Sequence, residues 1–282
     1  MNPKKHPYFG ARAVLATQHE KGQVIAPEFK SLLGMEIAEF QVDTDSLGTF
    51  TGEIERIGTA KDAVLTKARL GITESGCPRS LASEGSIGAD PIIPFINSDI
   101  ELIAFIDDEL NFQLVESVRS TEIIAATIKA QPSSDLSDFI RRADFPNHKL
   151  IVRSDDKPVS FSVKGVDSKQ MLEESLQRAF RDFPEVIIES DLRAHCSPSR
   201  MQNIGLAAKK LALRLQRLCP ECDAPGWGVV RVIRGLPCSQ CGEISEEKVR
   251  AEVFGCVKCI FIEEGRPLAD SIDPGNCNLC NP

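Results

Sequence analysis

The chain has 282 residues, of which 42% are hydrophobic and 26% are charged. These proportions are ordinary for a globular protein, and the length suits one large domain followed by a small one. The formal net charge is −8, with 41 acidic residues against 33 basic ones. A sequence-independent grip on nucleic-acid phosphates needs a basic surface, so the charge argues against that class of function. Apolar runs are short and no secretion signal is visible, so we expect a cytoplasmic protein without membrane contact.

The predicted elements of the first three quarters alternate between strands and helices. Strands are predicted at Arg12–Thr17, Met35–Val42, within Pro91–Ile106, from Leu114, at Lys149–Val152 and at Val186–Glu189. Helices are predicted at Pro27–Leu33, from Ala60, before Lys129, at Ser168–Phe180 and from Pro198. Gly34 is expected to end the first helix, and Thr59 with Asp62 forms a capping box for the second. The pattern predicts an α/β domain over residues 1–217, a mixed sheet with flanking helices.

The last predicted helix is the best defined. Ser197 is its expected cap, and Pro198 stands at its first helical position. Its apolar stripe consists of Met201, Ile204, Ala208, Leu211, Leu215 and Leu218. Because the helix runs straight into Cys219, we expect a rigid joint between the α/β domain and a small module over residues 218–282.

Eight of the ten cysteines form four Cys-x-x-Cys pairs in that module. The pairs are Cys219 with Cys222, Cys238 with Cys241, Cys256 with Cys259, and Cys277 with Cys280. Two intervening residues let one tight turn present both sulfurs to a tetrahedral metal, and four such pairs outweigh the alternative of a redox dithiol. We therefore predict a double zinc-ribbon module with two structural zinc ions. Four thiolates per ion leave no open position for catalysis.

The pairing of these cysteines is open at the level of spacing. Successive pairs are separated by fifteen, fourteen and seventeen residues, which is room for a hairpin or a short crossing segment. We favour sequential sites, the first pair with the second and the third with the fourth, while a crossed arrangement stays possible. The module carries six basic residues against ten acidic ones, so its charge does not favour nucleic acid either.

A polar run follows the strand that ends near Glu189. If the extended conformation continues, Glu189, Asp191, Arg193 and His195 point to one side, since side chains alternate along a strand. Arg200 lies in the first turn of the next helix, where the helix dipole disfavours a cation, and a bound anion would resolve that conflict. The alternative is an exposed, ion-paired loop.

Two further constellations lie earlier in the chain. Thr17, His19 and Lys21 belong to the loop after the first strand, where ligands sit in open α/β sheets. Glu84 stands among small residues, an environment in which a carboxylate can approach magnesium or water, and Lys67 lies on the preceding helix. Ordinary solvated loops are the alternative for both.

The order ATQHEK, IGTAKDAVLTKARLG, SLASEGS and SPSRMQNIG resembles the layout of the inosine triphosphate pyrophosphatase-like family. That family has a T-x-N-x-x-K loop, a helix carrying a Lys, an acidic turn and a late S-H-R motif. The resemblance implies a phosphate loop with Thr17, His19 and Lys21, and Lys67 on the helix. It also implies an acidic ligand at Glu84 and a late motif at Ser199 and Arg200. The chain departs from it: His replaces Asn, Lys21 comes one residue early, one carboxylate replaces two, and the late His is out of register.

The tail belongs to a second resemblance. CPECDAPGWG, GLPCSQCG, GCVKC and DPGNCNLCNP, together with ESDLRAH and PSRM, resemble a bacterial family of uncharacterised proteins with a C-terminal four-CxxC zinc tail. This resemblance extends over nearly the full chain and implies no particular activity.

The leading functional hypothesis is a Mg²⁺-dependent hydrolase of a nucleotide or another phosphorylated small molecule. Its catalytic residues would be Glu84, Asp191 and His195. Its substrate-binding residues would be Thr17, His19, Lys21, Lys67, Arg193 and Arg200. The rival is a non-catalytic zinc-ribbon adapter that binds a protein partner. A nucleic-acid binder and a Cys196 nucleophile beside His195 are the remaining, less favoured alternatives.

Overall fold

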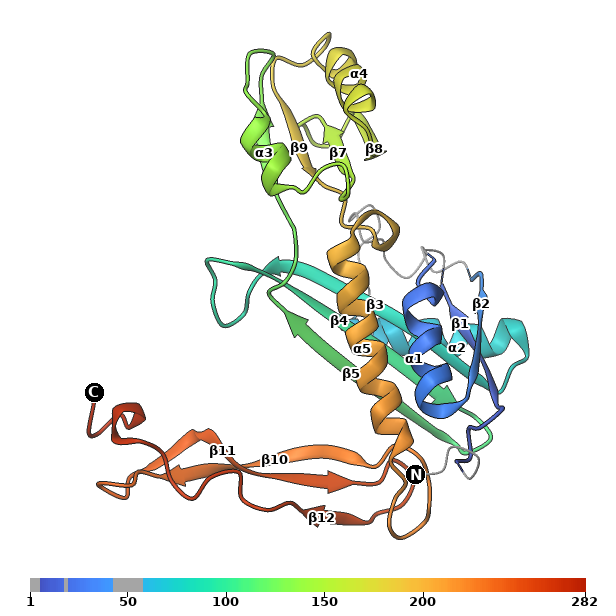
Figure 1. Cartoon of the computed structure of the whole chain (residues 1–282), viewed down its shortest axis with the longest axis vertical. Helices are drawn as coiled ribbons and strands as arrows, with labels where there is room; N and C mark the ends of the chain where they lie inside the picture. The colour runs from blue at the N-terminus through green and yellow to red at the C-terminus, as the bar shows by residue number, and fades with distance from the viewer. Residues whose placement is uncertain (1–5, 18–19, 43–57) are drawn as a thin grey trace.

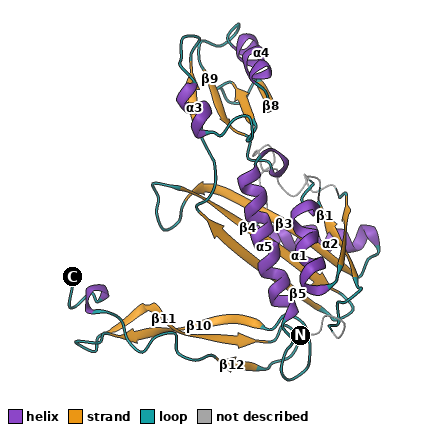
Figure 2. Ribbon diagram, viewed as in Figure 1, coloured by secondary structure: helices purple, strands orange, loops and turns teal. Residues whose placement is uncertain are grey.

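The structure is a computed structural model that describes residues 6–17, 20–42 and 58–282. Its strands form three sheets in that part of the chain, of five, four and three strands. Figures 1 and 2 show the five-stranded sheet in the middle of the molecule, the four-stranded sheet at one end and the three-stranded sheet at the other. The predicted fold class, a mixed α/β sheet with flanking helices followed by a small module with two four-cysteine sites, is confirmed.

The five-stranded sheet has the order β2-β1-β3-β4-β5. Its strands are β1 (Arg12–Ala16), β2 (Glu36–Phe40), β3 (Arg79–Ala89), β4 (Asn97–Asp107) and β5 (Phe112–Ser120). β1 is parallel to β2 and β3, whereas β3, β4 and β5 are antiparallel neighbours. β1 ends opposite Ala82, in the first half of β3, so β3 continues past the carboxyl end of β1.

Helices cover both faces of this sheet. α1 (Gly22–Leu33) and α5 (Pro198–Gln216) share one core with Leu81 and Ile103, while α2 (Ala60–Ser75) packs on Ala82 and its neighbours across the sheet. Odd-numbered residues of β3 and β4 therefore face α1 and α5, and even-numbered ones face α2. The predicted capping box of α2 is present, and Gly34 ends α1 with a positive φ of 67°. α1 begins five residues before the predicted start, with Pro27 inside its second turn.

The four-stranded sheet is inserted between β5 and α5 and has the order β6-β9-β7-β8. It comprises β6 (Thr127–Ala130), β7 (Leu150–Arg153), β8 (Ser162–Val166) and β9 (Val186–Ser190), with α3 (Ser137–Arg142) and α4 (Lys169–Ala179) packed around a core of their own. The helix expected before Lys129 is wrong, because Thr127–Ala130 pairs with β9 in an antiparallel ladder. The sequence pattern did not separate this unit from the rest of residues 1–217.

The C-terminal sheet is a long hairpin with a short third strand. β10 (Gly228–Pro237) pairs with β11 (Ile244–Gly255), and β12 (Ile262–Glu264) adds to the end of β11. At its base Arg217 O accepts hydrogen bonds from the backbone amides of Gly226 and Trp227 at 3.0 and 3.1 Å. α5 ends at Gln216, immediately before the predicted boundary between residues 217 and 218. None of the helices in the described ranges has the length and apolar character needed to cross a membrane.

Candidate functional site

The eight paired cysteines form two separate clusters. One cluster contains Cys219, Cys222, Cys256 and Cys259, and the other contains Cys238, Cys241, Cys277 and Cys280. Sulfur–sulfur distances of 3.8 and 3.6 Å occur in the first cluster and of 3.9 and 3.6 Å in the second, and all four sulfurs of each cluster lie within 4.8 Å of one another. A tetrahedral zinc site with Zn–S bonds of about 2.3 Å has edges of about 3.8 Å, so both clusters fit Zn²⁺.

The cysteines are paired in a crossed arrangement, which corrects the sequential pairing favoured from spacing. The first pair joins the third, and the second joins the fourth. The cause is the hairpin: β10 has ten residues, so its two ends lie about 30 Å apart, and the second pair occupies the far turn. The start of β10 and the end of β11 are adjacent, because the strands are antiparallel. Each metal site therefore closes one end of the same ribbon.

The backbone around the first cluster supports bound thiolates. The amides of Lys258 and Cys259 donate to Cys256 Sγ at 3.2 and 3.3 Å, which offsets part of the negative charge that four thiolates carry. With every ligand a cysteine, a metal ion in either cluster would have no open coordination position for chemistry. A two-stranded hairpin has little core of its own, so an ion at each end would stabilise this ribbon.

A second candidate site lies at the carboxyl end of β1. Lys21 stands at the N-terminal end of α1, and its Nζ donates to Ser83 Oγ at 2.9 Å on the α1 face of β3. Lys21 is buried, and that burial lowers the pKa of its ammonium group to about 8. The next largest cause is the positive charge of Arg200, which also lowers the pKa. The sequence-predicted loop lysine is thus held inside the molecule, among other charged groups.

Glu84 and Lys67 lie beside the carboxyl end of β1 as well, but on the opposite face of the sheet, which α2 covers. Lys67 Nζ donates to Glu84 Oε2 at 2.5 Å, and the two side chains are only 12% and 10% exposed. Glu84 belongs to the middle of β3, not to a loop, and the charges of both groups act on Lys21. The structure therefore brings together four sequence-predicted residues from separate elements. They are Lys21, Lys67, Glu84 and Arg200.

Arg200 pairs with an acid that the sequence analysis missed. Its Nε donates to Glu101 Oε1 at 2.6 Å, and its Nη1 donates to Leu192 O at 2.8 Å. This carboxylate balances the positive charge of Arg200 at the start of α5. Beside it, Asn203 Nδ2 donates to Asp99 Oδ2 at 2.9 Å. The sequence signal that could have identified Glu101 is the presence of two acids, Asp99 and Glu101, on one face of an otherwise apolar strand.

Asp99 and Glu101 are both completely buried. Burial and, after it, the negative charge of Glu101 raise the pKa of Asp99 to about 7. Asp99 Oδ1 and Glu101 Oε2 have no hydrogen-bond donor among the described residues. Two carboxylates in contact, each with an oxygen lacking a donor, are unusual in a protein interior.

Asp191 and Arg193 form a local ion pair with each other, on either side of the Leu192 carbonyl that Arg200 contacts. The Nη2 and Nε of Arg193 donate to Asp191 Oδ2 and Oδ1 at 2.5 and 2.9 Å, and Asp191 also accepts from the amide of Gly165 at 3.0 Å. β9 ends at Ser190, so the expected strand alternation through His195 does not occur, and residues 194–196 form a 3-10 turn. The pKa of His195 is lowered, first by partial desolvation and then by Arg193.

The remaining candidates are located as follows. Thr17 is buried directly after β1, and His19 lies outside the described residues. Ser199 donates its amide to His148 Nε2 at 3.2 Å, so this first-turn amide of α5 is occupied by an imidazole. Cys196 is buried, and burial followed by the charge of Asp191 raises the pKa of its thiol to about 11. A protonated, buried thiol is a poor nucleophile.

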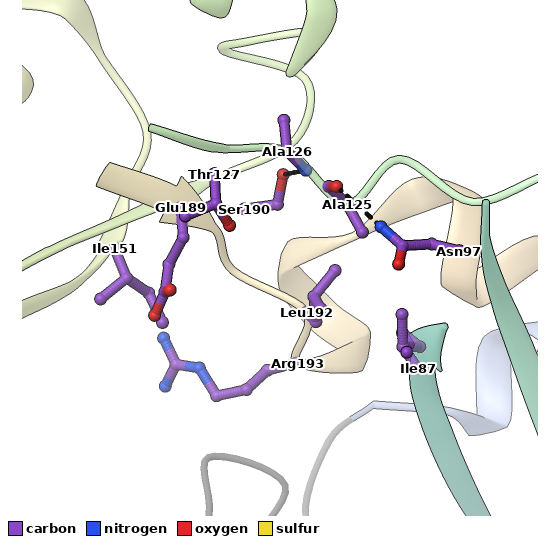
Figure 3. A pocket seen from close by; sticks show the side chains of 11 residues that line it. Ile87, Asn97, Ala125, Ala126, Thr127, Ile151, Glu189, Ser190, Leu192 and Arg193 are labelled. Atoms are coloured by element: carbon purple, nitrogen blue, oxygen red, sulfur yellow. Dashed lines mark hydrogen bonds between the residues drawn. The ribbon is translucent and has the colours of Figure 1, made fainter. Parts of the chain in front are cut away.

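A cavity of roughly 320 Å³ lies between the five-stranded and four-stranded sheets. Figure 3 shows Glu189 and Arg193 at one end and Asn97 with Ile87 at the other. Leu192 connects the cavity to the charged cluster, because it lines the cavity while its carbonyl accepts from Arg200. The cavity is lined by polar groups as well as by aliphatic side chains.

The fold and the cysteine clusters define a mixed α/β protein with two four-cysteine clusters at its C-terminal end that could each hold a metal ion. The chain belongs to the DUF6671 family, described as a domain of unknown function, which it matches over residues 67–282. Comparison with curated proteins finds no match.

Two solved structures show distant similarity to the chain. One is the protein VC0702 from Vibrio cholerae, at 13% identity over 39% of this chain and 58% of that one, with a TM-score of 0.27. The other is the nucleoside-triphosphatase / dITP/XTP pyrophosphatase from Mycobacterium abscessus, at 12% identity over 38% of this chain and 70% of that one, also with a TM-score of 0.27. The first match thus spans little more than half of its relative, and similarity at this level carries no conclusion about chemistry.

Proposed function

We propose that this protein is a hydrolase of a small phosphorylated metabolite such as a nucleotide, with the charged cluster at the carboxyl end of β1 as its active site. The observation that supports the proposal is the convergence of Lys21, Lys67 and Arg200 with Glu84 and Glu101 at the end of a parallel strand. Ligands of open α/β sheets bind at this place. Groups this deeply buried and this highly charged are costly to fold, which favours a functional reason for them.

Each cation has a defined role in this proposal. Lys21 and Arg200 face the same side of the sheet and provide a point charge and a planar fork for phosphate oxygens. Lys67 approaches from α2 on the other face. A phosphate group that takes over the Lys67 ammonium releases Glu84 from its ion pair, and Glu84 is then placed to orient or deprotonate an attacking water.

Within this proposal, Glu84 is the residue best suited to bind Mg²⁺. Magnesium prefers one or two carboxylates together with water and substrate phosphates, and Glu84 is the acid of the cluster paired with a flexible lysine instead of an arginine. When bound, the ion would neutralise charge that develops on the phosphate oxygens. Asp191 is less suited to hold it, since its oxygens are engaged by Arg193 and by the amide of Gly165.

The cavity between the sheets is the proposed seat of the non-phosphate part of the substrate. It adjoins Arg200 through Leu192, and its walls include the aliphatic side chains of Ile87 and Ile151. Arg193 and Asn97 offer polar groups at its two ends. A flat or compact organic group fits these walls better than a polymer does.

The test is phosphate and pyrophosphate release by zinc-loaded protein from a panel of nucleotides and sugar phosphates with Mg²⁺. We expect turnover of at least one substrate, and a loss of about 100-fold or more in Glu84→Gln and Lys21→Met. Glu116→Gln is the matched control. Glu116 is a buried acid on β5, and its partner Arg214 lies on α5, the helix that also carries Arg200, but outside the charged cluster. Silence across the panel, with both zinc ions retained, would reject the hydrolase.

A non-catalytic adapter is the second candidate, and one observation favours it. The C-terminal three-stranded sheet extends from the rest of the molecule. It exposes apolar side chains, among them Val230 on β10 and Ile262 on β12, each about half exposed, and Ile260 in the loop before β12, which is fully exposed. Exposed apolar groups on a metal-stapled ribbon suit a protein partner. A cellular phenotype that survives Glu84→Gln but not Ile260→Asp would support the adapter over the enzyme.

A further inference from the structure

We propose that Asp99 and Glu101 share a single proton, and that this proton controls how strongly Arg200 binds an anion at the proposed active site. The two acids stand two residues apart on β4 and point to the same face. Both are completely buried, and each has one carboxyl oxygen, Asp99 Oδ1 and Glu101 Oε2, that no donor reaches in the described part of the chain.

A shared proton accounts for both of these oxygens at once. Two carboxylates in contact at a buried site cannot both ionise readily, so one proton remains between them. That proton turns the contact of two acceptors into a hydrogen bond. The raised pKa of Asp99, which arises first from burial and then from Glu101, agrees with this geometry.

A metal ion between the two acids is the alternative, and the surroundings oppose it. Groups of three or more metal-binding side chains occur, within the described residues, only at the two cysteine clusters. Two carboxylates beside a guanidinium make a poor site for a divalent cation, because Arg200 already contributes a positive charge 2.6 Å from Glu101. A proton satisfies the same oxygens without that repulsion.

Among the described residues, the groups around the pair come from α5, the start of α1, β3 and α2. On α5, Arg200 contacts Glu101, and the neutral Asn203 contacts Asp99. Lys21 approaches from the start of α1, where the charges of Arg200 and Glu101 both act on it. From β3, Gly85 offers only backbone: a Cβ placed on it would lie 2.3 Å from Glu101 and 2.5 Å from Arg200. The Lys67–Glu84 pair lies behind β3, on the α2 face.

The charge balance gives the direction of the control. With the proton in place, the acid pair carries one negative charge, which cancels Arg200 and leaves Lys21 to attract an anion. Without it, the pair carries two negative charges and opposes the anion. Anion affinity should therefore fall as the pH rises through the titration of the pair. An added charge a few ångströms away in a partly buried site is worth about a tenfold change in affinity or more.

The experiment uses sulfate as the probe, since its charge does not change near neutral pH, unlike that of phosphate. The full-length, zinc-loaded protein is followed by carboxyl ¹³C NMR without ligand, and its sulfate dissociation constant is measured between pH 5 and pH 9. We expect one carboxyl signal, lost in Asp99→Asn, to titrate near neutral pH. We expect sulfate binding to weaken about tenfold across the same range. Asp99→Asn should keep tight binding until Lys21 deprotonates, and Glu116→Gln should behave like the unsubstituted protein.

The two measurements separate this inference from the proposed function on which it rests. If no carboxyl titrates near neutral pH, or if Asp99→Asn follows the same pH profile as the unsubstituted protein, the shared proton is refuted even where sulfate binds. If a carboxyl titrates but sulfate binds at no pH, the anion site and its control by the pair are refuted, and the proposed function loses its support. If Asp99→Asn fails to fold, Glu101→Gln replaces it as the variant that assigns the titrating signal to the pair, because it removes the other acid that shares the proton.

Discussion

Arg200 Nε lies 2.6 Å from Glu101 Oε1, so the first turn of α5 is tied to the middle of the sheet by an ion pair with almost no solvent exposure. The guanidinium also reaches Leu192 O at the edge of the cavity. One side chain therefore connects the sheet, the segment that leads out of the four-stranded unit, and the proposed phosphate site. Changes at this residue should affect stability and ligand binding together.

Removal of Arg200 alone should be strongly destabilising. Arg200→Met leaves Glu101 buried without its partner, and such losses cost about 3–5 kcal/mol of the free energy of unfolding. Arg200→Met combined with Glu101→Leu should recover much of that loss, because neither charge remains. Urea denaturation of the single and double variants measures the coupling. The matched cycle uses Arg214 and Glu116, which are also 2.6 Å apart; because Glu116 keeps Lys210 as a second cation, Arg214→Met should cost less.

Any side chain at Gly85 should destabilise the protein. Its substitution by alanine would place a methyl group 2.3 Å from Glu101 Oε1 and 2.5 Å from Arg200 Nη2, so the buried pair must move. We expect Gly85→Ala to lower the free energy of unfolding by about 1–3 kcal/mol and to weaken sulfate binding. Gly88→Ala on the same strand is the control, since no atom of the described residues lies within 4 Å of its added Cβ. Equal thermal stability of the two variants would contradict the tight packing at Gly85.

The elements with strong local signals were predictable from the sequence. The capping box at Thr59, the glycine stop at Gly34 and the apolar stripe of α5 up to Leu215 occur where expected, because each depends on neighbouring residues. Leu218, the last residue of the predicted stripe, lies beyond the helix, which ends at Gln216. The strand at Thr127–Ala130 was mistaken for a helix. Its partner, β9, lies almost sixty residues further along the chain, and pairing over that distance leaves no local periodicity.

For the candidate site, too, single residues could be predicted from the sequence, whereas their contacts could not. Lys21, Lys67, Glu84 and Arg200 were singled out individually, but their partners depend on which strand neighbours which. Glu101 was missed because an acid in an apolar strand looks like a solvent-facing position until α5 is known to cover that face. The crossed cysteine pairing has the same origin, since only the antiparallel hairpin brings the first and third pairs together.

Anion binding should weaken above about pH 8 through Lys21. Burial lowers the pKa of this ammonium group to about 8, so it is charged at neutral pH and becomes neutral as the pH rises through that value. Because the pKa is lower in the folded state than in the unfolded one, stability should rise with pH between about 8 and 10.5, while anion affinity falls. Lys21→Arg should move the loss of sulfate binding to higher pH. A profile that Lys21→Met leaves unchanged would assign the titration to another group.

The crossed zinc pairing predicts which pairs of cysteine substitutions share a metal. Cys219→Ser combined with Cys256→Ser damages one site, so the protein should retain one zinc ion per chain after mild chelation. Cys219→Ser combined with Cys238→Ser damages both sites, so it should retain none. Sequential pairing would give the opposite result for the two variants. Metal content of the purified proteins, measured by mass spectrometry, decides between them, and the unsubstituted chain with two ions is the reference. Since each ion closes one end of the β10–β11 ribbon, the first variant should also keep the far turn protected from proteolysis while the base near α5 becomes sensitive.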